Sequence, residues 1–411
     1  MDEYREKVIK PGDRASKRGR EICLASFDNC QAVRVIRAQG GLFRGLPEGW
    51  LWLPHIYERL LDHDIDRNGR VTRWVMRETA QNDGAGGKPQ FFTLVNTDEV
   101  MFGLGWEIIT MCADDIARNG GFPAIMINEL QAKRVTDANF PLVDAAYTGY
   151  GEALRQARLV NLTGETAIMR HSITAFCDAR SDDQLVLTWG GTCLGLEHAD
   201  MVPDRRLIAP GMSVIGFVEP GYRCNGGTFF TELITALHGT DPKKLTESVE
   251  VYAFAEKLCV PSQSYAQLIC RILGWNPDAT ISKPVAKVRG IAHITGGGLW
   301  EKFGELLPAG VGAHLYGMPK PAEVLLEAQE MAERTKNPLS DLDAYSTFHG
   351  GCGMLLVCAK EEADAVIRTA RMYNVEAQEV GEITEDLSQE ILVQSRFRNG
   401  GELSSKMLEA A

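Results

Sequence analysis

Apolar and polar residues alternate along this chain in two different rhythms. Short runs rich in β-branched residues are typical of strands, whereas apolar residues that recur every three to four positions are typical of amphipathic helices. From Gly40 to the end of the chain the two patterns follow one another repeatedly. We therefore predict an α/β (α+β) fold rather than a β-sandwich or a helix bundle.

Two blocks of this alternation are predicted, with a domain boundary near residue 200. The segment 196–211 is polar, contains two prolines and precedes a new strand. The first block is predicted to contain strands at 91–99, 124–130, 159–167 and 183–191, and helices at 105–121 and 141–158. The second is predicted to contain strands at 213–218, 290–295 and 353–359, and helices at 229–239, 265–273, 299–308 and 322–335.

The predicted domains are therefore 91–200 and 201–411, and two further segments precede them. Residues 1–44 hold ten Lys and Arg against six Asp and Glu, and we interpret them as a basic, loosely packed arm. Residues 45–90 contain three tryptophans and are interpreted as an insertion. The insertion ends in QNDGAGGKP, for which we predict a flexible glycine-rich loop.

Composition and charge limit the kinds of molecule that this protein is expected to bind. The 411 residues carry a net charge of −12, which argues against binding to nucleic acid or to an anionic membrane and favours small molecules. The N-terminus is charged where a signal peptide would be apolar, and no apolar run is long enough to span a bilayer, so we expect a soluble, cytoplasmic protein. Ten cysteines without a C-x-x-C pair are expected to be buried thiols.

Two glycine-rich segments are candidates for anion binding. In AHITGGGLWEKFGELLP, Gly296, Gly297 and Gly298 lie between a predicted strand and a predicted helix. Glycines let backbone N–H groups approach a phosphate closely, and the helix dipole favours negative charge at this end. In PGYRCNGG, Asn225 and Gly226 precede another helix, although ordinary turn chemistry would also explain an Asn-Gly pair.

Carboxylates at the ends of predicted elements are candidates for a divalent-metal site. TGETA places Glu165 and Thr166 after an apolar strand, Asp98 ends the strand NTDE, and Asp115 lies on a helix. If they converged, they would hold the Mg²⁺ that neutralises phosphate charge in ATP chemistry. The alternative for TGETA is a glycine turn with a solvated glutamate.

Taken in order, these segments resemble the aminoimidazole ribonucleotide synthetase (AIR synthase) family. The resemblance extends from Gly40 to Thr384. It is carried by GGLF, the Asp of NTD, MCADDIARNGGFP, TGETA, PGMSVIGFVEPGYRCNGG, VPSQSY, AHITGGGLWEKFGELLP, AYSTFHGGCGMLLV and VGEIT.

This resemblance implies a two-domain fold and a homodimer in which the N-terminal sheets form an intersubunit barrel. It also implies an activity, the ATP-dependent closure of formylglycinamidine ribonucleotide to aminoimidazole ribonucleotide with release of ADP and phosphate. Phosphorylation would turn a poor leaving group, the amide oxygen, into a phosphate ester. The implied ligands are ATP, Mg²⁺ and a small ribonucleotide substrate.

Roles follow from the resemblance position by position. Asp98, Asp115, Glu165 and Thr166 match the family's Mg-ATP positions, with Asp98, Asp115 and Glu165 as metal ligands. Asn225, Gly226 and Gly296 to Gly298 match its substrate-binding segments, and Asp115 and His293 are the catalytic candidates. A lone histidine on a strand is nevertheless more often structural than catalytic.

The chain departs from the family at several of these places. After its strand-end Asp the family continues Gly-Val-Gly-Thr-Lys, whereas residues 99–102 are Glu-Val-Met-Phe. A phosphate-binding lysine and its glycine loop are therefore expected to be absent. The family's His-Ser-Asn-Gly is replaced by residues 223–226, Arg-Cys-Asn-Gly. Two alternatives stay open: a related enzyme that phosphorylates another small acceptor, or a dimeric nucleotide-binding protein without turnover.

Overall fold

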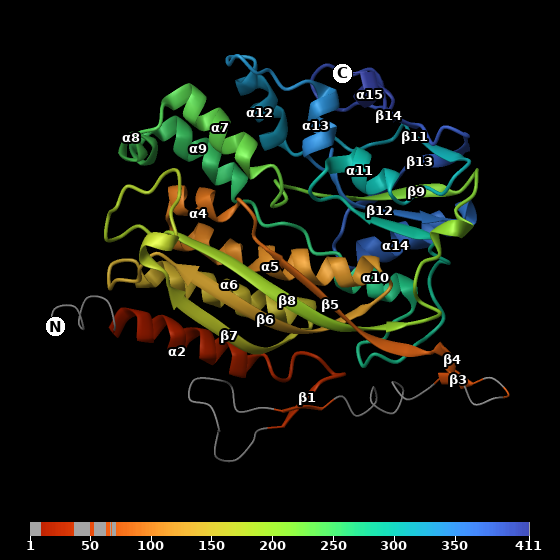
Figure 1. Cartoon of the computed structure of the whole chain (residues 1–411), viewed down its shortest axis with the longest axis horizontal. Coiled ribbons are helices and arrows are strands. Elements are labelled where there is room, and N and C mark those ends of the chain that lie inside the picture. The colour runs from red at the N-terminus through yellow and green to blue at the C-terminus, as the bar shows by residue number, and fades with distance from the viewer. Residues whose placement is uncertain (1–9, 37–49, 53–62, 66, 68–70, 411) are drawn as a thin grey trace.

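The computed structural model describes residues 10–36, 50–52, 63–65, 67 and 71–410, which form two α/β domains around two separate sheets (Figure 1). The N-terminal sheet has four strands in the order β5-β8-β6-β7. Its strands are β5 (Met76–Gly84), β6 (Phe122–Ala132), β7 (Val160–Ile168) and β8 (Leu187–His198). Only β6 and β7 run parallel within this sheet.

Helices cover one face of the N-terminal sheet. They are α2 (Lys10–Ala25), α4 (Pro89–Val95), α5 (Asp98–Arg118) and α6 (Phe140–Ala157). Thr97 caps α5 by accepting from the backbone N–H of Val100, and two acidic residues in the first turn complement the helix dipole. The long helix α5 packs on α6 and on the sheet, and it also contacts the second domain.

The C-terminal domain contains a seven-stranded mixed sheet in the order β10-β12-β9-β13-β11-β14-β15. Its strands are β9 (Ser213–Val218), β10 (Gly290–His293), β11 (Val311–Leu315), β12 (Cys352–Cys358), β13 (Ala377–Glu385), β14 (Ile391–Gln394) and β15 (Glu402–Ser404). Its helices are α7 (Gly227–His238), α8 (Pro242–Glu247), α9 (Val249–Leu258), α10 (Ala266–Leu273), α11 (Gly298–Gly304), α12 (Glu323–Ala332), α13 (Asp341–Thr347), α14 (Ala363–Met372) and α15 (Met407–Ala410).

Helix α5 joins the two domains. It contacts β5, β6 and β8 of its own sheet and also α10 and β10 of the C-terminal domain. Figure 1 shows α5 and α10 lying between the two sheets. Residues on the last turns of α5 are therefore placed between the domains.

The predicted two-domain α/β fold is confirmed, and most predicted elements lie at the expected positions. The strand predicted at 91–99 is wrong, because these residues form α4 and the start of α5. Pro89 lies in the first turn of α4, and Asn96 ends it in the left-handed conformation, with its N–H bonded to the carbonyl of Phe92. These end signals favour a helix over a strand for an apolar run that is buried on all sides.

The interpretation of the basic arm also needs correction where the structure describes it. Residues 10–25 form α2, which packs against β7 and α6 and buries Ala15 and Ile22. Arg18 pairs with Asp144 of α6 at 2.5 Å. The arm is thus packed on the sheet domain over this range, and residues 1–9 and 37–44 lie outside the described residues.

Much of the predicted insertion 45–90 lies outside the described residues, namely 45–49, 53–62, 66 and 68–70. Two short hairpins are described, β1 (Arg34–Ile36) with β2 (Trp50–Trp52), and β3 (His63–Ile65) with β4 (Val71–Trp74). The predicted loop QNDGAGGKP is partly a strand, because β5 extends to Gly84 and pairs with β8. The intersubunit barrel stays a prediction.

All ten cysteines lie in the described part of the chain, where each is buried and unpaired. The prediction of buried thiols is confirmed. Within the same described ranges, no helix is long and apolar enough to cross a membrane.

Gly105 of α5 and Gly149 of α6 allow these two helices to approach closely. A Cβ atom on Gly149 would lie 1.7 Å from the carbonyl oxygen of Phe102, so we expect Gly149→Ala to destabilise the protein by about 3 kcal/mol through overpacking. Gly304→Ala in α11 is the control, because its Cβ would meet only Ile391 at 3.7 Å, an ordinary contact. Urea denaturation of both variants tests this, and equal stabilities would contradict it.

Candidate functional site

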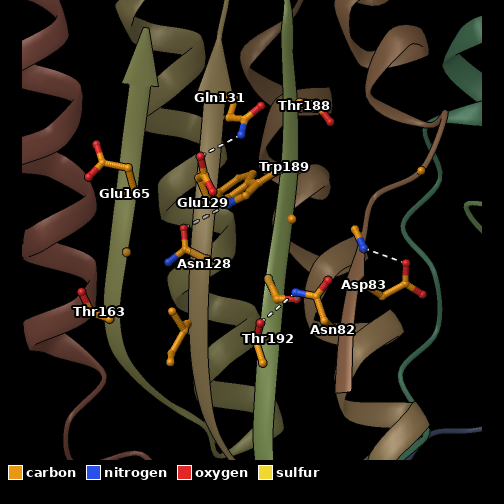
Figure 2. A pocket seen from close by; sticks show the side chains of 16 residues that line it. Asn82, Asp83, Asn128, Glu129, Gln131, Thr163, Glu165, Thr188, Trp189 and Thr192 are labelled. Carbon is orange, nitrogen blue, oxygen red and sulfur yellow. Dashed lines mark hydrogen bonds between the residues drawn. The ribbon is translucent and has the colours of Figure 1, made fainter. Parts of the chain in front are cut away.

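A cavity of about 760 Å³ lies on the four-stranded sheet (Figure 2). It extends over all four strands and presents polar side chains to solvent. Asn82 donates to the Thr192 hydroxyl across β5 and β8 at 2.8 Å, and Gln131 donates to Glu129 along β6 at 2.7 Å. The polar lining residues are Asn82, Asp83, Asn128, Glu129, Gln131, Thr163, Glu165, Thr188 and Thr192.

A glycine loop opens at one edge of this cavity. Strand β5 ends in Asp83 and Gly84, both of which line the cavity, and residues 85–88 follow as Ala-Gly-Gly-Lys. The Asp83 carboxylate accepts from the backbone N–H of Gly84 at 2.7 Å. Gly86 has a φ of 56°, a conformation that L side chains rarely adopt. The order Asp-Gly-x-Gly-x-Lys over residues 83–88 is the one that the resembled family carries at the end of this strand.

This loop packs against the loop before α7 in the other domain. A Cβ on Gly86 would lie 2.6 Å from the carbonyl oxygen of Cys224, and a Cβ on Gly87 would lie 3.1 Å from Cα of Gly227. The loop before α7 in turn meets the loop before α11, because a Cβ on Gly296 would lie 3.4 Å from the Asn225 side chain. Three glycine-rich loops from distant parts of the sequence therefore meet at the domain boundary.

Arg223, in the loop before α7, is the centre of a buried network of ion pairs and hydrogen bonds between the domains. Its guanidinium lies 2.6 Å from Glu219 and 2.6 Å from Asp114 of α5, and none of the three side chains is exposed. It also donates to the carbonyl of Gln263 at 2.7 Å. Asp114 accepts a further hydrogen bond from the backbone N–H of Tyr265 at 2.9 Å. The ion pair between Arg223 and Asp114 and the hydrogen bonds at Gln263 and Tyr265 thus join α5 to two loops of the C-terminal domain.

His293, at the end of β10, extends this network to Asp115. Its Nε2 atom faces the Arg223 guanidinium at 2.8 Å, and its Nδ1 atom lies 2.9 Å from Oδ1 of Asp115. Burial lowers the pKa of His293 to about 4, and the positive charge of Arg223 acts in the same direction. His293 is therefore neutral at pH 7.

Asp115 stays ionised. Burial acts to raise its pKa, but the hydrogen bond from His293 and the charges of Arg118 and Arg223 outweigh burial and leave the pKa below its usual value. Burial raises the pKa of Asp83, and the negative charge of the nearby Asp115 raises it further. The Cys112 thiol of α5 lies 3.7 Å from the carbonyl oxygen of Asp83, so the end of β5 lies beside the helix segment that carries Asp115. A cation held by the two carboxylates would relieve their mutual repulsion.

Lys88 of the glycine loop forms a second buried link between the domains. Its ammonium group pairs with Glu107 of α5 at 2.8 Å, with neither side chain exposed, and donates to the carbonyls of Tyr222 and Val260. Glu107 also accepts from the backbone N–H and the hydroxyl of Ser262. Lys88 thus holds the glycine loop in place and does not face the cavity.

The predicted cluster of Asp98, Asp115 and Glu165 does not form. Asp98 opens α5 and Asp115 lies in its last turn, so about 25 Å of helix axis separates them. Glu165 is on β7, at one edge of the sheet, and Asp83 is on β5, at the opposite edge. Ordinary strand spacing puts these two strands roughly 14 Å apart, so Glu165 is also distant from the glycine loop. Over the ranges that the structure describes, no group of three acidic, His or Cys side chains is arranged to hold a metal.

The alternative of a glycine turn in TGETA is wrong, because β7 continues without interruption to Ile168. Gly164 is needed for packing, since a Cβ there would lie 2.5 Å from the side-chain amide of Asn128. Thr166 hydrogen-bonds to the Tyr147 hydroxyl at 2.5 Å on the helix side. Glu165 alone of the pair lines the large cavity.

The glycine-rich segments on the predicted substrate side do come together. Gly226 is the N-cap of α7 and Gly297 the N-cap of α11, both with positive φ. Gly298 allows the backbone of Tyr345 to approach closely. Glu301 folds back over the α11 terminus, where a Cβ on Gly297 would meet its carboxylate at 2.2 Å. An anion bound at this turn would meet that carboxylate.

The donor set suits a magnesium ion that arrives with a phosphorylated ligand. Mg²⁺ is usually held by one or two carboxylates together with phosphate oxygens and waters, rather than by a cage of protein ligands. Asp83 lines the cavity, and Oδ2 of Asp115 has no hydrogen-bond partner among the described residues. These two carboxylates fit that role, which the sequence analysis gave to Asp98, Asp115 and Glu165.

Sequence reasoning thus missed two features of the site. The first is the loop 83–88, whose Asp-Gly-x-Gly-x-Lys order matches the family pattern that was judged absent after Asp98. The second is Arg223, which had been noted only as a departure from the family. The signal for the loop was in the sequence, but a strand was predicted about fifteen residues too late.

Comparisons with known proteins agree with the two-domain description. Residues 74–196 match the model of the AIR synthase related protein N-terminal domain, and residues 278–394 match that of its C-terminal domain. Together the two matches span more than half of the chain. The first match includes β5 and the loop 83–88.

Two similar curated proteins carry the same name. The phosphoribosylformylglycinamidine cyclo-ligase of Synechococcus sp. (strain CC9902) is 25% identical over 308 residues, which cover 73% of this chain and 79% of that protein. The same enzyme of Synechococcus sp. (strain CC9605) is 27% identical over 292 residues, 69% of this chain and 74% of that one. Among solved structures, Escherichia coli HypE, a hydrogenase maturation protein, has a TM-score of 0.50 at 14% identity and covers 94% of this chain and 95% of its own. That likeness concerns the fold.

The buried Lys88–Glu107 pair gives a stability prediction. Lys88→Met is expected to lower the free energy of unfolding by about 3 to 5 kcal/mol, because Glu107 would remain as a buried charge without a partner. The double variant Lys88→Met/Glu107→Gln should recover part of that loss. The control is Lys257→Met, which removes a solvent-exposed pair with Glu327 and should cost less than about 1 kcal/mol. Guanidinium denaturation compares them, and similar losses for Lys88→Met and Lys257→Met would contradict the prediction.

Proposed function

Because the chain belongs to the AIR synthase related protein family, we propose that it is an ATP-dependent ligase that activates a carboxamide oxygen by phosphorylation. The proposed acceptor is formylglycinamidine ribonucleotide, which would be closed to aminoimidazole ribonucleotide with release of ADP and phosphate. The name shared by the curated relatives supports this choice of acceptor.

One observation carries the proposal: the glycine loop 83–88 lies against the loop that begins α7, which in turn meets the loop that begins α11. The first loop has the composition of a phosphate loop and ends the strand that lines the large cavity. The other two present backbone N–H groups at helix starts. A nucleotide phosphate at the first loop and an acceptor at the other two would be neighbours, which is what direct phosphoryl transfer requires.

In the proposed reaction the protein mainly positions groups and balances charge. Mg²⁺, when bound with ATP, supplies positive charge against the phosphates. Asp83 and Asp115 would hold it, and the side chains of Asn82, Thr188 and Thr192 offer hydrogen bonds along the cavity. Backbone N–H groups near Gly226 would orient the acceptor, so that an internal nitrogen of its open chain reaches the activated carbon and phosphate leaves as the ring closes.

The direct test is incubation of the purified protein with formylglycinamidine ribonucleotide, ATP and Mg²⁺. We expect ADP and aminoimidazole ribonucleotide to form in equal amounts. ATP hydrolysis or binding without imidazole formation would reject this acceptor.

A second acceptor is favoured by two observations on the substrate side. Arg223 stands where the family has histidine, and it is wholly engaged in buried ion pairs. The Glu301 carboxylate lies over the turn expected to bind substrate phosphate. If no imidazole forms, a related carboxamide or carboxylate without a phosphate at that turn is the next acceptor to assay, with ADP release as the readout.

Substitutions can test whether Asp83 and Asp115, rather than Asp98, hold the cation. Asp83→Asn and Asp115→Asn are each expected to lower turnover about a hundredfold, because each removes one negative charge that balances the cation. Asp98→Asn is the matched control on the same helix and should leave turnover unchanged. Steady-state rates at saturating ATP test this. A large loss of turnover in the Asp98 variant alone would show that Asp98, and not Asp83, is the cation ligand.

A further inference from the structure

The hydrogen bonds around His293 define which of its nitrogens carries the proton. The guanidinium of Arg223 has only donors, and its Nε and a terminal nitrogen both face Nε2 of His293, at 3.1 and 2.8 Å. Nε2 must therefore accept, which makes it the unprotonated nitrogen. The proton then lies on Nδ1, which donates to Oδ1 of Asp115 at 2.9 Å.

Arg223 cannot easily change this arrangement. Its other contacts, to Glu219, Asp114 and the carbonyl of Gln263, occupy the rest of the guanidinium, and the side chain is fully buried. Because Asp114 and Asp115 are neighbours on α5, Arg223 holds the first directly and the second through His293. The last turn of α5 is thus fixed to the C-terminal domain at two successive carboxylates.

The contacts to Asp115 fall on one of its two oxygens. Nδ1 of His293 and Nε of Arg118 both lie 2.9 Å from Oδ1. Oδ2 has no hydrogen-bond partner among the described residues, and the side chain is 19% exposed. The carboxylate is therefore held by one oxygen while the other stays available to a ligand.

We infer that Arg223 and His293 are positioning residues for a divalent cation: Arg223 holds His293 as the Nδ1–H tautomer, and His293 anchors Asp115 so that its second oxygen is presented to the ion. The inference rests on the proposed role of Asp115 as a cation ligand. Groups that orient a ligand in this way change metal affinity without touching the metal.

Mn²⁺ serves as the probe, with binding measured by calorimetry in the presence of ADP and without any acceptor. His293→Leu removes the donor to Asp115 and should weaken Mn²⁺ affinity 10- to 100-fold. His293→Asn keeps an N–H donor close to the position of Nδ1 and should stay within about threefold of the wild type. Equal affinities for the two variants would overturn the inference.

The control is His349→Leu, which removes another buried histidine. Among the described residues its ring bonds to backbone atoms alone, at Gly221 and Gly351. Melting temperatures can fall in both Leu variants, but Mn²⁺ affinity should fall only in His293→Leu. A matching loss in the control would mean that general loosening is the cause, and would overturn the inference.

If His293→Leu does not fold, a measurement on the wild-type protein still tests the inference. Histidine ¹⁵N NMR, with the signal assigned from His293→Asn, should show the Nδ1–H tautomer at pH 7, and the Nε2–H form or the imidazolium would overturn the inference. These readouts need no turnover. If the variants rank in Mn²⁺ affinity as predicted but the protein does not form aminoimidazole ribonucleotide, only the proposed acceptor is rejected. If the wild-type protein does not bind Mn²⁺, the role of Asp115 as a cation ligand is overturned, and this inference with it.

Discussion

The positive charge of Arg223 lies where solvent does not reach, and the arrangement of the two domains depends on how that charge is balanced. Glu219 comes from its own domain and Asp114 from α5 of the other, and both carboxylates lie 2.6 Å from the guanidinium. Burying any one of these charges alone would be strongly unfavourable, so the three must be buried together. The domains can dock only in the orientation that brings them into contact.

A second buried pair acts in the same way beside it. Lys88 and Glu107 belong to the N-terminal domain, but their remaining hydrogen bonds go to Tyr222, Val260 and Ser262 in the other domain. The loop that would bind nucleotide phosphates is therefore held by contacts to the domain that would bind the acceptor. Rigid placement of both loops suits a reaction in which positioning and charge balance do most of the work.

Local patterns predicted the fold well and the site only in part. Amphipathic periodicity identified α6, α7, α10 and α12, and the glycine-rich starts of α7 and α11 were recognised as candidate anion sites. The error at 91–99 had larger consequences, because an apolar run buried on all sides has no period that separates helix from strand. Placing a strand there made Asp98 a strand-end residue, and Asp83 at the true end of β5 was overlooked.

The sequence by itself determined the α/β class, the two blocks, the burial of the cysteines and the family, since these depend on periodicity, composition and the order of local motifs. Tertiary structure alone decided which carboxylates can share an ion. Asp98 and Asp115 lie on one helix yet about 25 Å apart, whereas Asp83, at the end of β5, lies beside the segment of α5 that carries Asp115. It also decided that Arg223, His293 and Asp115 form one chain of contacts, because hydrogen bonds and ion pairs depend on distance in space, which spacing along the chain does not record.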